Sequence, residues 1–364
     1  MARVLKIKTF LVSLFLGMLS LHLPVCAQEK AWEQLIQAAR KEGKVVVVGS
    51  ADSEVRKAVP AKFKERFGIA LEYIGISAGD LLARLRAERQ SGLYTIDVLL
   101  MSVINAVPYY AEKLLTPLPP LILEEVVQPA KWRDGKLHYI DPEQKYFLRF
   151  FDYLNPLFLI NTRFVKREEI RSIHELSNPK WKGKISLRDP FTTAHSVPVV
   201  LYMSLGERFI KKLYVDNQPK FTADRRQQAD WLARGTQPIS IGVLDSDFDR
   251  LRKDGFPVEM IVSLPDFPGY IVAGSGNVSI YNGAPHPNAA RLFANWLLSR
   301  EGLDFYARIR GEATLRNDID PSSVTLPELI PRPGVKYLDA GGWEFGEKRL
   351  AVTERIKEII RANR

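Results

Sequence analysis

Small hydroxyl and amide residues follow four apolar segments of this sequence, at points where a strand would pass into a helix. The four loops are Ser50–Ser53, Ser77–Gly79, Ser102–Asn105 and Asp189–Thr193. In open α/β sheets, ligands bind outside the carboxyl ends of the strands, where helix N-termini present unpaired N–H groups. Because such N–H groups bind anions well, a carboxylate or phosphate group suits this pattern. Taken together, the four loops predict one ligand-binding cleft.

Each of these residues also has a purely structural explanation. Ser50, Ser77, Thr192 and Thr193 are all typical helix N-caps. Asp245 follows the apolar segment Ile239–Val243, which makes it either an N-cap or a contact for a cationic group. The aromatic ring of Tyr153 either packs between two parts of the chain or stacks on an amine or a ring. The candidate ligand-binding residues are Ser50, Ala51, Asp52, Ser77, Ser102, Tyr153, Asp189, Thr192, Thr193 and Asp245. They leave the charge of the ligand open.

The elements that must position these loops alternate between strand and helix. Apolar strands are expected at Val45–Val48, Leu71–Ile76, Ile96–Met101, Tyr146–Phe151, Leu157–Ile160, Lys184–Leu187 and Ile239–Val243. Near-continuous apolar strands separated by helices indicate a mainly parallel sheet that is covered on both faces. A helical stripe runs from Val55 to Phe67, with Pro60 expected to kink or restart it. Another helix is expected to begin near Thr192 or Thr193.

One further helix has a clear start. The segment HPNAARLFANWLLSREG at 286–302 follows a strand-like run, Ile271–Tyr281, and a turn at Asn282-Gly283. Pro287 suits the first turn of a helix, where its missing N–H costs nothing. Apolar residues then recur at helical spacing and predict one buried face. A final amphipathic helix is expected to carry Val352, Ile356, Ile359 and Ile360.

The N-terminus predicts export. Arg3, Lys6 and Lys8 precede an apolar run from Phe10 to Leu23, and Val25-Cys26-Ala27 offers small residues at positions −3 and −1 for cleavage before Gln28. Residues 1–27 are therefore expected to form a cleaved signal peptide, with a periplasmic mature chain. The alternative is a lipoprotein anchored at Cys26, but Pro24 and Val25 fit poorly where lipidation prefers small residues. Cys26 is the sole cysteine, so no intramolecular disulfide is expected.

Composition predicts a globular chain and disfavours several classes. Cleavage after residue 27 removes three cations, which lowers the formal charge from +10 to +7 and leaves 337 residues, enough for two lobes. Nucleic acid is not an expected partner, because the basic residues form no long stripe interleaved with aromatics. No GxSxG elbow, HExxH motif or histidine pair at metal-ligand spacing occurs, so no catalytic or metal site is assigned. No cofactor is expected.

The order and spacing of several segments resemble the extracellular solute-binding proteins of ABC importers, in the branch that contains the periplasmic ferric-binding proteins. The segments are GKVVVVGS at 43–50, IDVLLMS at 96–102, WKGKISLRDP at 181–190, GTQPISIGV at 235–243 and NVSIYNGAPHPNAARLFANWLLSREG at 277–302. The resemblance implies an α/β, two-lobed type 2 periplasmic-binding fold. Each lobe would be a mixed, mainly parallel sheet flanked by helices, with a hinge and an interlobe cleft. The implied partners are a small solute, possibly anionic or a chelate, and an ABC permease with its separate ATPase. A monomer is expected.

The resemblance also raises the question of iron. Ferric-binding relatives hold the metal with an adjacent tyrosine pair just after the strand that resembles GTQPISIGV. This sequence has Asp245 and Ser246 at that place. Tyr109-Tyr110 is an adjacent pair elsewhere, interpreted as helix packing. Direct ferric binding is therefore not expected, whereas iron held through a chelator stays open.

Domain boundaries complete the sequence predictions. The first lobe is expected to comprise residues 28–107 and 267–315, and the second lobe residues 108–266 and 316–364. The hinge is expected near Ser102 and Tyr270. A secreted enzyme and a sensor that docks on a membrane receptor remain alternatives on the same fold.

Overall fold

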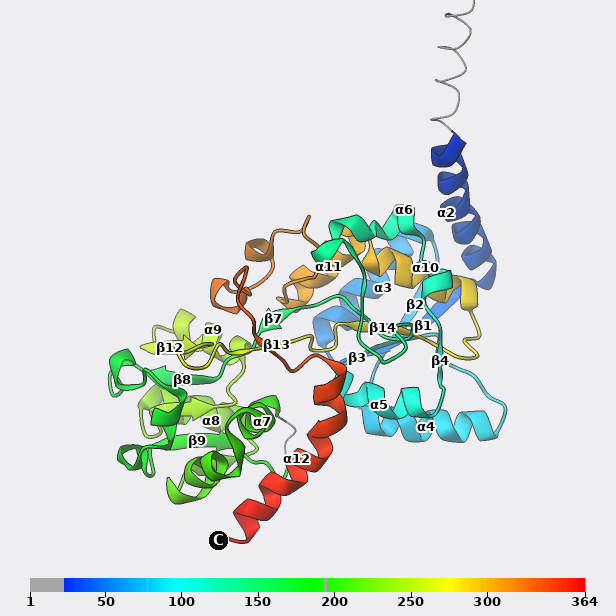
Figure 1. Ribbon diagram of the computed structural model, residues 1–364. Helices are drawn as coiled ribbons and strands as arrows, with labels where there is room; N and C mark the ends of the chain where they lie inside the picture. Colours follow the sequence, from blue (N-terminus) through cyan, green and yellow to red (C-terminus); the bar gives the residue numbers. More distant parts are fainter. Residues whose placement is uncertain (1–22, 77, 193–194, 364) are drawn as a thin grey trace, which may run out of the picture.

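The computed structural model describes residues 23–76, 78–192 and 195–363. Two α/β lobes lie side by side and are joined by a narrow region around strands β7 and β13 (Figure 1). We use "first lobe" for the elements around the seven-stranded sheet and "second lobe" for those around the five-stranded sheet. This architecture confirms the two-lobed α/β fold predicted from the sequence.

The first sheet is mixed. Its strands, in the order β2-β1-β3-β14-β6-β5, are β2 (Ala70–Gly75), β1 (Lys44–Gly49), β3 (Val98–Met101), β14 (Asn277–Tyr281), β6 (Leu148–Arg149) and β5 (His138–Tyr139), and β4 (Leu115–Thr116) also pairs with β14. β1 runs parallel to β2 and β3, whereas β14 is antiparallel to its neighbours. The predicted return of the chain into this sheet near Tyr281 is confirmed.

The second sheet has the same mixed character. Its order is β10 (Lys220–Thr222), β9 (Ile185–Arg188), β11 (Ile239–Ile241), β8 (Phe158–Asn161) and β12 (Val258–Ile261). β9 and β11 are parallel, so their carboxyl ends meet at one edge of the sheet. Every residue of β8 is buried, as expected of a central strand.

Helices cover both sheets. They are α2 (Leu23–Glu42), α3 (Ser53–Phe67), α4 (Ala78–Gln90), α5 (Val103–Ala111), α6 (Glu124–Val127), α7 (Ser196–Lys211), α8 (Arg225–Arg234), α9 (Asp245–Lys253), α10 (Pro287–Leu298), α11 (Arg300–Arg310) and α12 (Trp343–Arg361). α10 begins at Pro287 and buries Phe293 and Trp296, as predicted. The ring of Trp296 lies 5.4 Å from that of Phe63 on α3. Of the kink or restart expected at Pro60, the restart does not occur, because α3 continues through this residue.

The crossings between the lobes include the one expected near Tyr270 but not the one expected near Ser102. A small sheet in the order β15-β13-β7, formed by β15 (Leu338–Asp339), β13 (Tyr270–Val272) and β7 (Tyr153–Leu154), lies between the lobes. The chain crosses here and not near Ser102, which instead precedes α5 of the first lobe. Residues 108–151, expected in the second lobe, contribute β4, β5 and β6 to the first sheet. Strands of two residues carry no readable period, which explains the difference.

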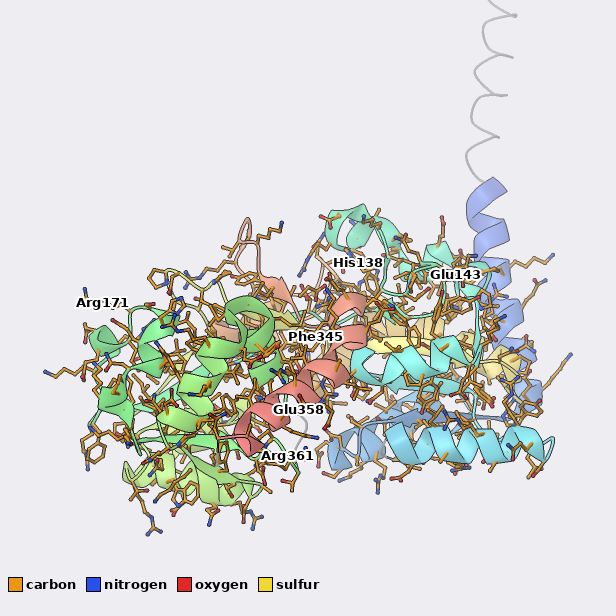
Figure 2. All side chains as sticks on the ribbon, turned by 60° about the horizontal axis from the view of Figure 1, so that its bottom comes forward. His138, Glu143, Arg171, Phe345, Glu358 and Arg361 are labelled. Atoms are coloured by element: carbon orange, nitrogen blue, oxygen red, sulfur yellow. The ribbon has the colours of Figure 1, made fainter. Side chains whose placement is uncertain are left out.

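The C-terminal helix spans the junction. α12 packs against α7 of the second lobe and against α5 of the first. Figure 2 shows Phe345 near the start of α12 between the two lobes, with Glu358 and Arg361 toward its far end on the second lobe. Ile356, Ile359 and Ile360 are buried, as the sequence predicted.

The predicted signal peptide lies mostly outside the described residues. α2 begins at Leu23 and therefore includes the predicted cleavage point after Ala27. Among the helices of the described chain, none is long and apolar enough to cross a membrane.

Candidate ligand site between the lobes

The carboxyl ends of β1 and β3 bring two of the predicted serines together. Ser50 and Ser102 line one cavity of about 130 Å³, together with Asn105 and Ser275. β1 and β3 are adjacent and parallel, which is why the residues after them meet at one edge. Ser77 lies outside the described residues. The cavity presents hydroxyl and amide groups to a ligand.

The helix that follows Ser50 is capped by Asp52 and not by Ser50. The Asp52 carboxylate accepts hydrogen bonds from the backbone N–H groups of Glu54 (2.9 Å) and Val55 (3.1 Å) and so caps α3. Ser102 stands at the N-cap position of α5, but its side chain makes no capping bond. The first N–H groups of α5 are therefore not capped by that hydroxyl. Ala51 is exposed between the two strand ends.

A charged cluster borders this cavity, and the sequence patterns did not reveal it. Arg310 donates to the Ser50 hydroxyl (3.3 Å), to the Asp52 carboxylate (2.9 Å) and to Glu312 Oε1 (2.7 Å). Gly311 ends α11 in the left-handed conformation, with φ of 64°, and this turn allows Glu312 to fold back beside Arg310. The sequence signal that could have revealed this cluster was the pair Arg310 and Glu312 on either side of Gly311. Oppositely charged residues around a glycine that ends a helix are also common on protein surfaces.

Glu312 is the least solvated member of this cluster. Its side chain is 8% exposed, and Oε2 has no hydrogen-bond partner among the described residues. The Tyr153 hydroxyl donates to Oε1 over 3.2 Å. Burial raises the pKa of Glu312, although the positive charge of Arg310 opposes this shift. A buried carboxylate oxygen without a partner is ready to accept a hydrogen bond from a ligand.

The second lobe contributes Asp245 to the same place. Burial raises the pKa of this carboxyl, against the lowering effects of backbone N–H groups and of Arg310 and Arg225. The charge of Asp245 in turn raises the pKa of Tyr153 and of Glu312. Asp245 is the first residue of α9, whose N-cap position is held by Leu244. Tyr153 and Asp245, predicted separately, thus lie close enough to interact.

The loop after β9 differs from its prediction. Asp189 accepts hydrogen bonds from the Phe191 N–H (2.9 Å) and the Thr192 hydroxyl (3.2 Å). These local bonds favour a turn over a helix. Consequently α7 begins at Ser196 and not near Thr192, which is exposed, or Thr193, which lies outside the described residues.

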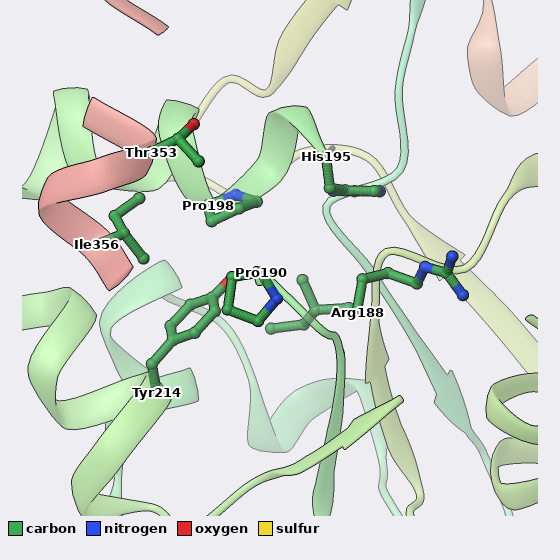
Figure 3. Close-up of a pocket in the computed structure, with 8 residues that line it drawn as sticks. Arg188, Pro190, His195, Pro198, Tyr214, Thr353 and Ile356 are labelled. Atoms are coloured by element: carbon green, nitrogen blue, oxygen red, sulfur yellow. The ribbon is translucent and has the colours of Figure 1, made fainter. Parts of the chain in front are cut away.

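His195 forms the N-cap of α7 in place of a hydroxyl residue. Its Nδ1 accepts the Val197 N–H over 3.2 Å. Burial, reinforced by Arg188 and Arg349, lowers the pKa of His195 to about 4. Figure 3 shows the residue at the rim of a cavity of about 20 Å³ that also includes Pro190, Tyr214 and Ile356. This cavity holds no more than a small molecule of the size of water.

The pKa of His195 predicts an acid-sensitive stability. Because the folded protein keeps His195 neutral while the unfolded chain protonates near pH 6.5, stability should fall as the pH drops from about 6.5 to 4. We expect His195 to account for about 2 to 3 kcal/mol of this loss, since its side chain is partly exposed. Urea unfolding across this range should show a smaller loss for His195→Gln than for the wild type. Parallel curves for the two proteins would contradict the assignment.

The adjacent tyrosines also have a structural outcome. Tyr109 and Tyr110 lie on α5, where Tyr109 is buried and Tyr110 packs edge-on against Trp343, so their interpretation as helix packing is confirmed. No group of three or more His, Cys, Asp or Glu side chains suited to a metal ion occurs in the part of the chain that the structure describes.

Comparisons with known proteins agree with the two-lobed fold. The family model "Bacterial extracellular solute-binding protein" matches residues 58–328. An uncharacterised protein of Haemophilus influenzae is 27% identical over 281 residues, which cover 73% of this chain and 75% of the relative.

Solved structures of low sequence identity share the fold. Iron-bound HitA from Pseudomonas aeruginosa is 15% identical, with a TM-score of 0.65, over 86% of this chain and 99% of its own. The periplasmic binding protein AfuA from Actinobacillus pleuropneumoniae, with fructose-6-phosphate bound, is 20% identical, with a TM-score of 0.61, over 88% and 99%. The two relatives carry different ligands, so the shared fold does not identify the ligand of this chain.

Proposed function

The chain belongs to the bacterial extracellular solute-binding proteins, and from this premise we propose that it captures its solute between the lobes, at the carboxyl ends of β1, β3 and β11. It is the solute-binding component of an ABC-type importer, since delivery to a membrane permease is the general role of this family. The observation that supports the proposed site is the cluster of Arg310, Glu312 and Tyr153, which lies within electrostatic reach of Asp245 of the opposite lobe.

The arrangement supports capture through hydrogen bonds and charge. Ser50, Ser102 and Asn105 offer polar groups on the first lobe, and Glu312 offers an acceptor without a partner. Because Asp245 belongs to the second lobe, a solute that contacts both carboxylates would hold the lobes together. Asp189, Thr192 and the undescribed Ser77 and Thr193 remain proposed rim residues.

The remaining expectations become part of this proposal. We propose that the mature chain begins after Ala27, acts in the periplasm as a monomer and releases its solute unchanged to a permease driven by a separate ATPase. Lipid anchoring at Cys26 is the alternative for the N-terminus. The alternative to the permease as partner is a membrane receptor, on which the protein would dock as a sensor.

We also propose that direct ferric binding is weak. Asp245 and Ser246 occupy the place where ferric-binding relatives have tyrosines, and burial together with Glu312 raises the pKa of nearby Tyr153. A phenol that stays protonated is a poor ligand for iron. Titration with ferric citrate should therefore produce no tyrosinate charge-transfer band in the visible spectrum. A saturable band of one-to-one stoichiometry would overturn this proposal.

A ligand screen tests the proposed site. A solute at about 100 times its dissociation constant adds about 2.7 kcal/mol to the free energy of unfolding, so a thermal-shift screen should reveal it. Calorimetry of Ser102→Ala with that solute should show a loss of about 0.5 to 1.5 kcal/mol in binding free energy, as for one neutral hydrogen bond. Asp245→Asn should weaken a cationic solute and leave an anionic one unchanged or tighter.

The control is Asp249→Asn, one turn further along α9, where the carboxylate contacts Arg252 and Lys253 at the surface. It should leave the affinity unchanged for any solute. Wild-type affinity in both Ser102→Ala and Asp245→Asn would place the site elsewhere.

A further inference from the structure

Arg349 is a buried cation that has no counter-ion among the described residues. It lies on α12 and is 7% exposed, and its buried Nε atom has no hydrogen-bond partner among the described residues. Among the described residues, none forms a hydrogen bond or an ion pair with its guanidinium, and burial alone lowers its pKa. An uncompensated buried charge is strongly unfavourable, so its retention needs an explanation.

Arg188 of the second lobe is partly buried and also has an unused donor. It ends β9, and its Nη1 is enclosed and has no partner in the described chain. The nearest acidic groups are already engaged: Asp247 pairs with Arg225 (3.0 Å), and Asp224 caps α8. The guanidinium groups of Arg188 and Arg349 thus each keep at least one N–H donor without a partner among the described residues.

His195 connects the two arginines. A Cβ at Gly242 would lie 2.5 Å from Arg188 Cγ and 3.2 Å from His195 Nε2, so this glycine admits both side chains together. Figure 3 shows Arg188 and His195 extending to the same side, away from Tyr214 and Ile356. Arg349 also acts electrostatically on His195. Arg188 and His195 therefore lie together, and Arg349 is close enough to influence His195 electrostatically.

The protonation of His195 makes it a donor beside Arg188. Its Nδ1 accepts the Val197 N–H, so the proton of the neutral ring resides on Nε2. The imidazole thus adds an N–H group without adding positive charge.

The first lobe approaches the same region through α5. A Cβ at Gly346 of α12 would lie 3.0 Å from the carbonyl oxygen of Val103, so α12 touches the first turn of α5. Arg349 is one turn further along α12. The positive end of α5, which the Ser102 side chain does not cap, therefore adds to the potential near Arg349.

We propose that Arg188, Arg349 and His195 Nε2–H bind the anionic group of the solute, and that this group is a phosphate or phosphonate. Three separate donor groups can serve the three terminal oxygens of a phosphate, whereas one arginine fork already satisfies a planar carboxylate. The rest of the solute then reaches toward Glu312 and Asp245, whose acceptors suit hydroxyl or amine groups. This inference rests on the proposed binding of a solute between the lobes.

Inorganic phosphate and methylphosphonate are the probes that test it. At constant ionic strength and neutral pH, both should raise the melting temperature of the wild type, and acetate should not. Arg188→Met and Arg349→Met should each weaken phosphate binding by about tenfold or more, as expected for the loss of charge-assisted hydrogen bonds. The matched control is Arg355→Met on the same helix, because Arg355 is exposed and pairs with Glu207 over 3.0 Å. It should bind phosphate as the wild type does.

A second measurement separates binding from structure. Without any anion, Arg349→Met should melt at the same temperature as the wild type or higher, because it removes an uncompensated buried charge. A lower melting temperature would show that Arg349 supports the fold and would contradict the proposal. Three results would each overturn the proposal. Neither phosphorus probe stabilises the wild type, or both arginine variants bind phosphate as tightly as the wild type does, or acetate stabilises the wild type to the same degree as phosphate.

The outcomes also distinguish this inference from the proposed function. A neutral or cationic solute from the screen that binds both arginine variants with unchanged affinity would overturn the anion site and leave the interlobe site standing. If no solute from the screen stabilises the wild type, the proposed function fails as well.

Discussion

Replacement of Asp152 by Ala is expected to lower the free energy of unfolding by about 3 to 5 kcal/mol. Asp152 is 1% exposed, immediately before β7 where the chain leaves the first lobe. Its carboxylate accepts hydrogen bonds from both Arg133 and Arg149. Without it, the buried Arg149 would lose its best-enclosed counter-ion, and an unpaired buried charge is costly.

Arg149 also ties a second crossing segment to this point. It donates to Asp339 of β15 over 2.8 Å and to the Phe151 carbonyl over 3.0 Å. Urea unfolding measures the effect, with Asp339→Ala as the control, since that carboxylate is 48% exposed and its loss should cost about 1 kcal/mol or less. Equal losses for the two variants, or a loss below 1 kcal/mol for Asp152→Ala, would contradict the importance of the buried pair.

Replacement of Arg310 by Met is expected to have the second-largest effect. Its side chain is 16% exposed and joins Asp52 to Glu312. We expect a loss of about 2 to 4 kcal/mol in the free energy of unfolding, somewhat below the value for a fully buried pair. Solute affinity should also fall, because Glu312 would lose the guanidinium that holds its Oε1 atom in place.

A double-mutant cycle isolates the pair. Glu312→Gln in the Arg310→Met background should recover part of the lost stability, since it removes the unpaired charge, but it should not recover solute binding. The matched surface control is Arg308→Met, which removes an exposed pair with Asp304 and should cost about 0.5 kcal/mol. Additive effects of Arg310→Met and Glu312→Gln would contradict a coupled pair.

Much of the fold could be predicted from local patterns. The apolar strands that end at Gly49 and Met101, and the helix that starts at Pro287, carry strong periodicity and cap signals, and each forms as expected. The division into lobes was harder to predict. β4, β5 and β6 have two residues each, and the three strands β7, β13 and β15 come from a stretch of more than 180 residues. Short strands with distant partners leave no local signal.

The site was only partly predictable for the same reason. Ser50 and Ser102 follow parallel neighbouring strands, so a general rule for α/β sheets brings them together. Arg310 and Glu312 lie at the end of α11 and Arg349 lies within α12, and nothing in their local sequence distinguishes them from surface charges. Their burial, and the missing partners of Glu312 and Arg349, exist only in the folded chain.

Solution X-ray scattering tests the central claim, which is that a solute bound by both lobes holds them together. The radius of gyration should be measured with and without a saturating concentration of the solute found by thermal shift, for the wild type and for Arg310→Met. A smaller radius for the wild type with its solute, and no change for Arg310→Met at the same concentration, is the predicted result. An unchanged radius for the wild type at saturation would contradict capture between the lobes.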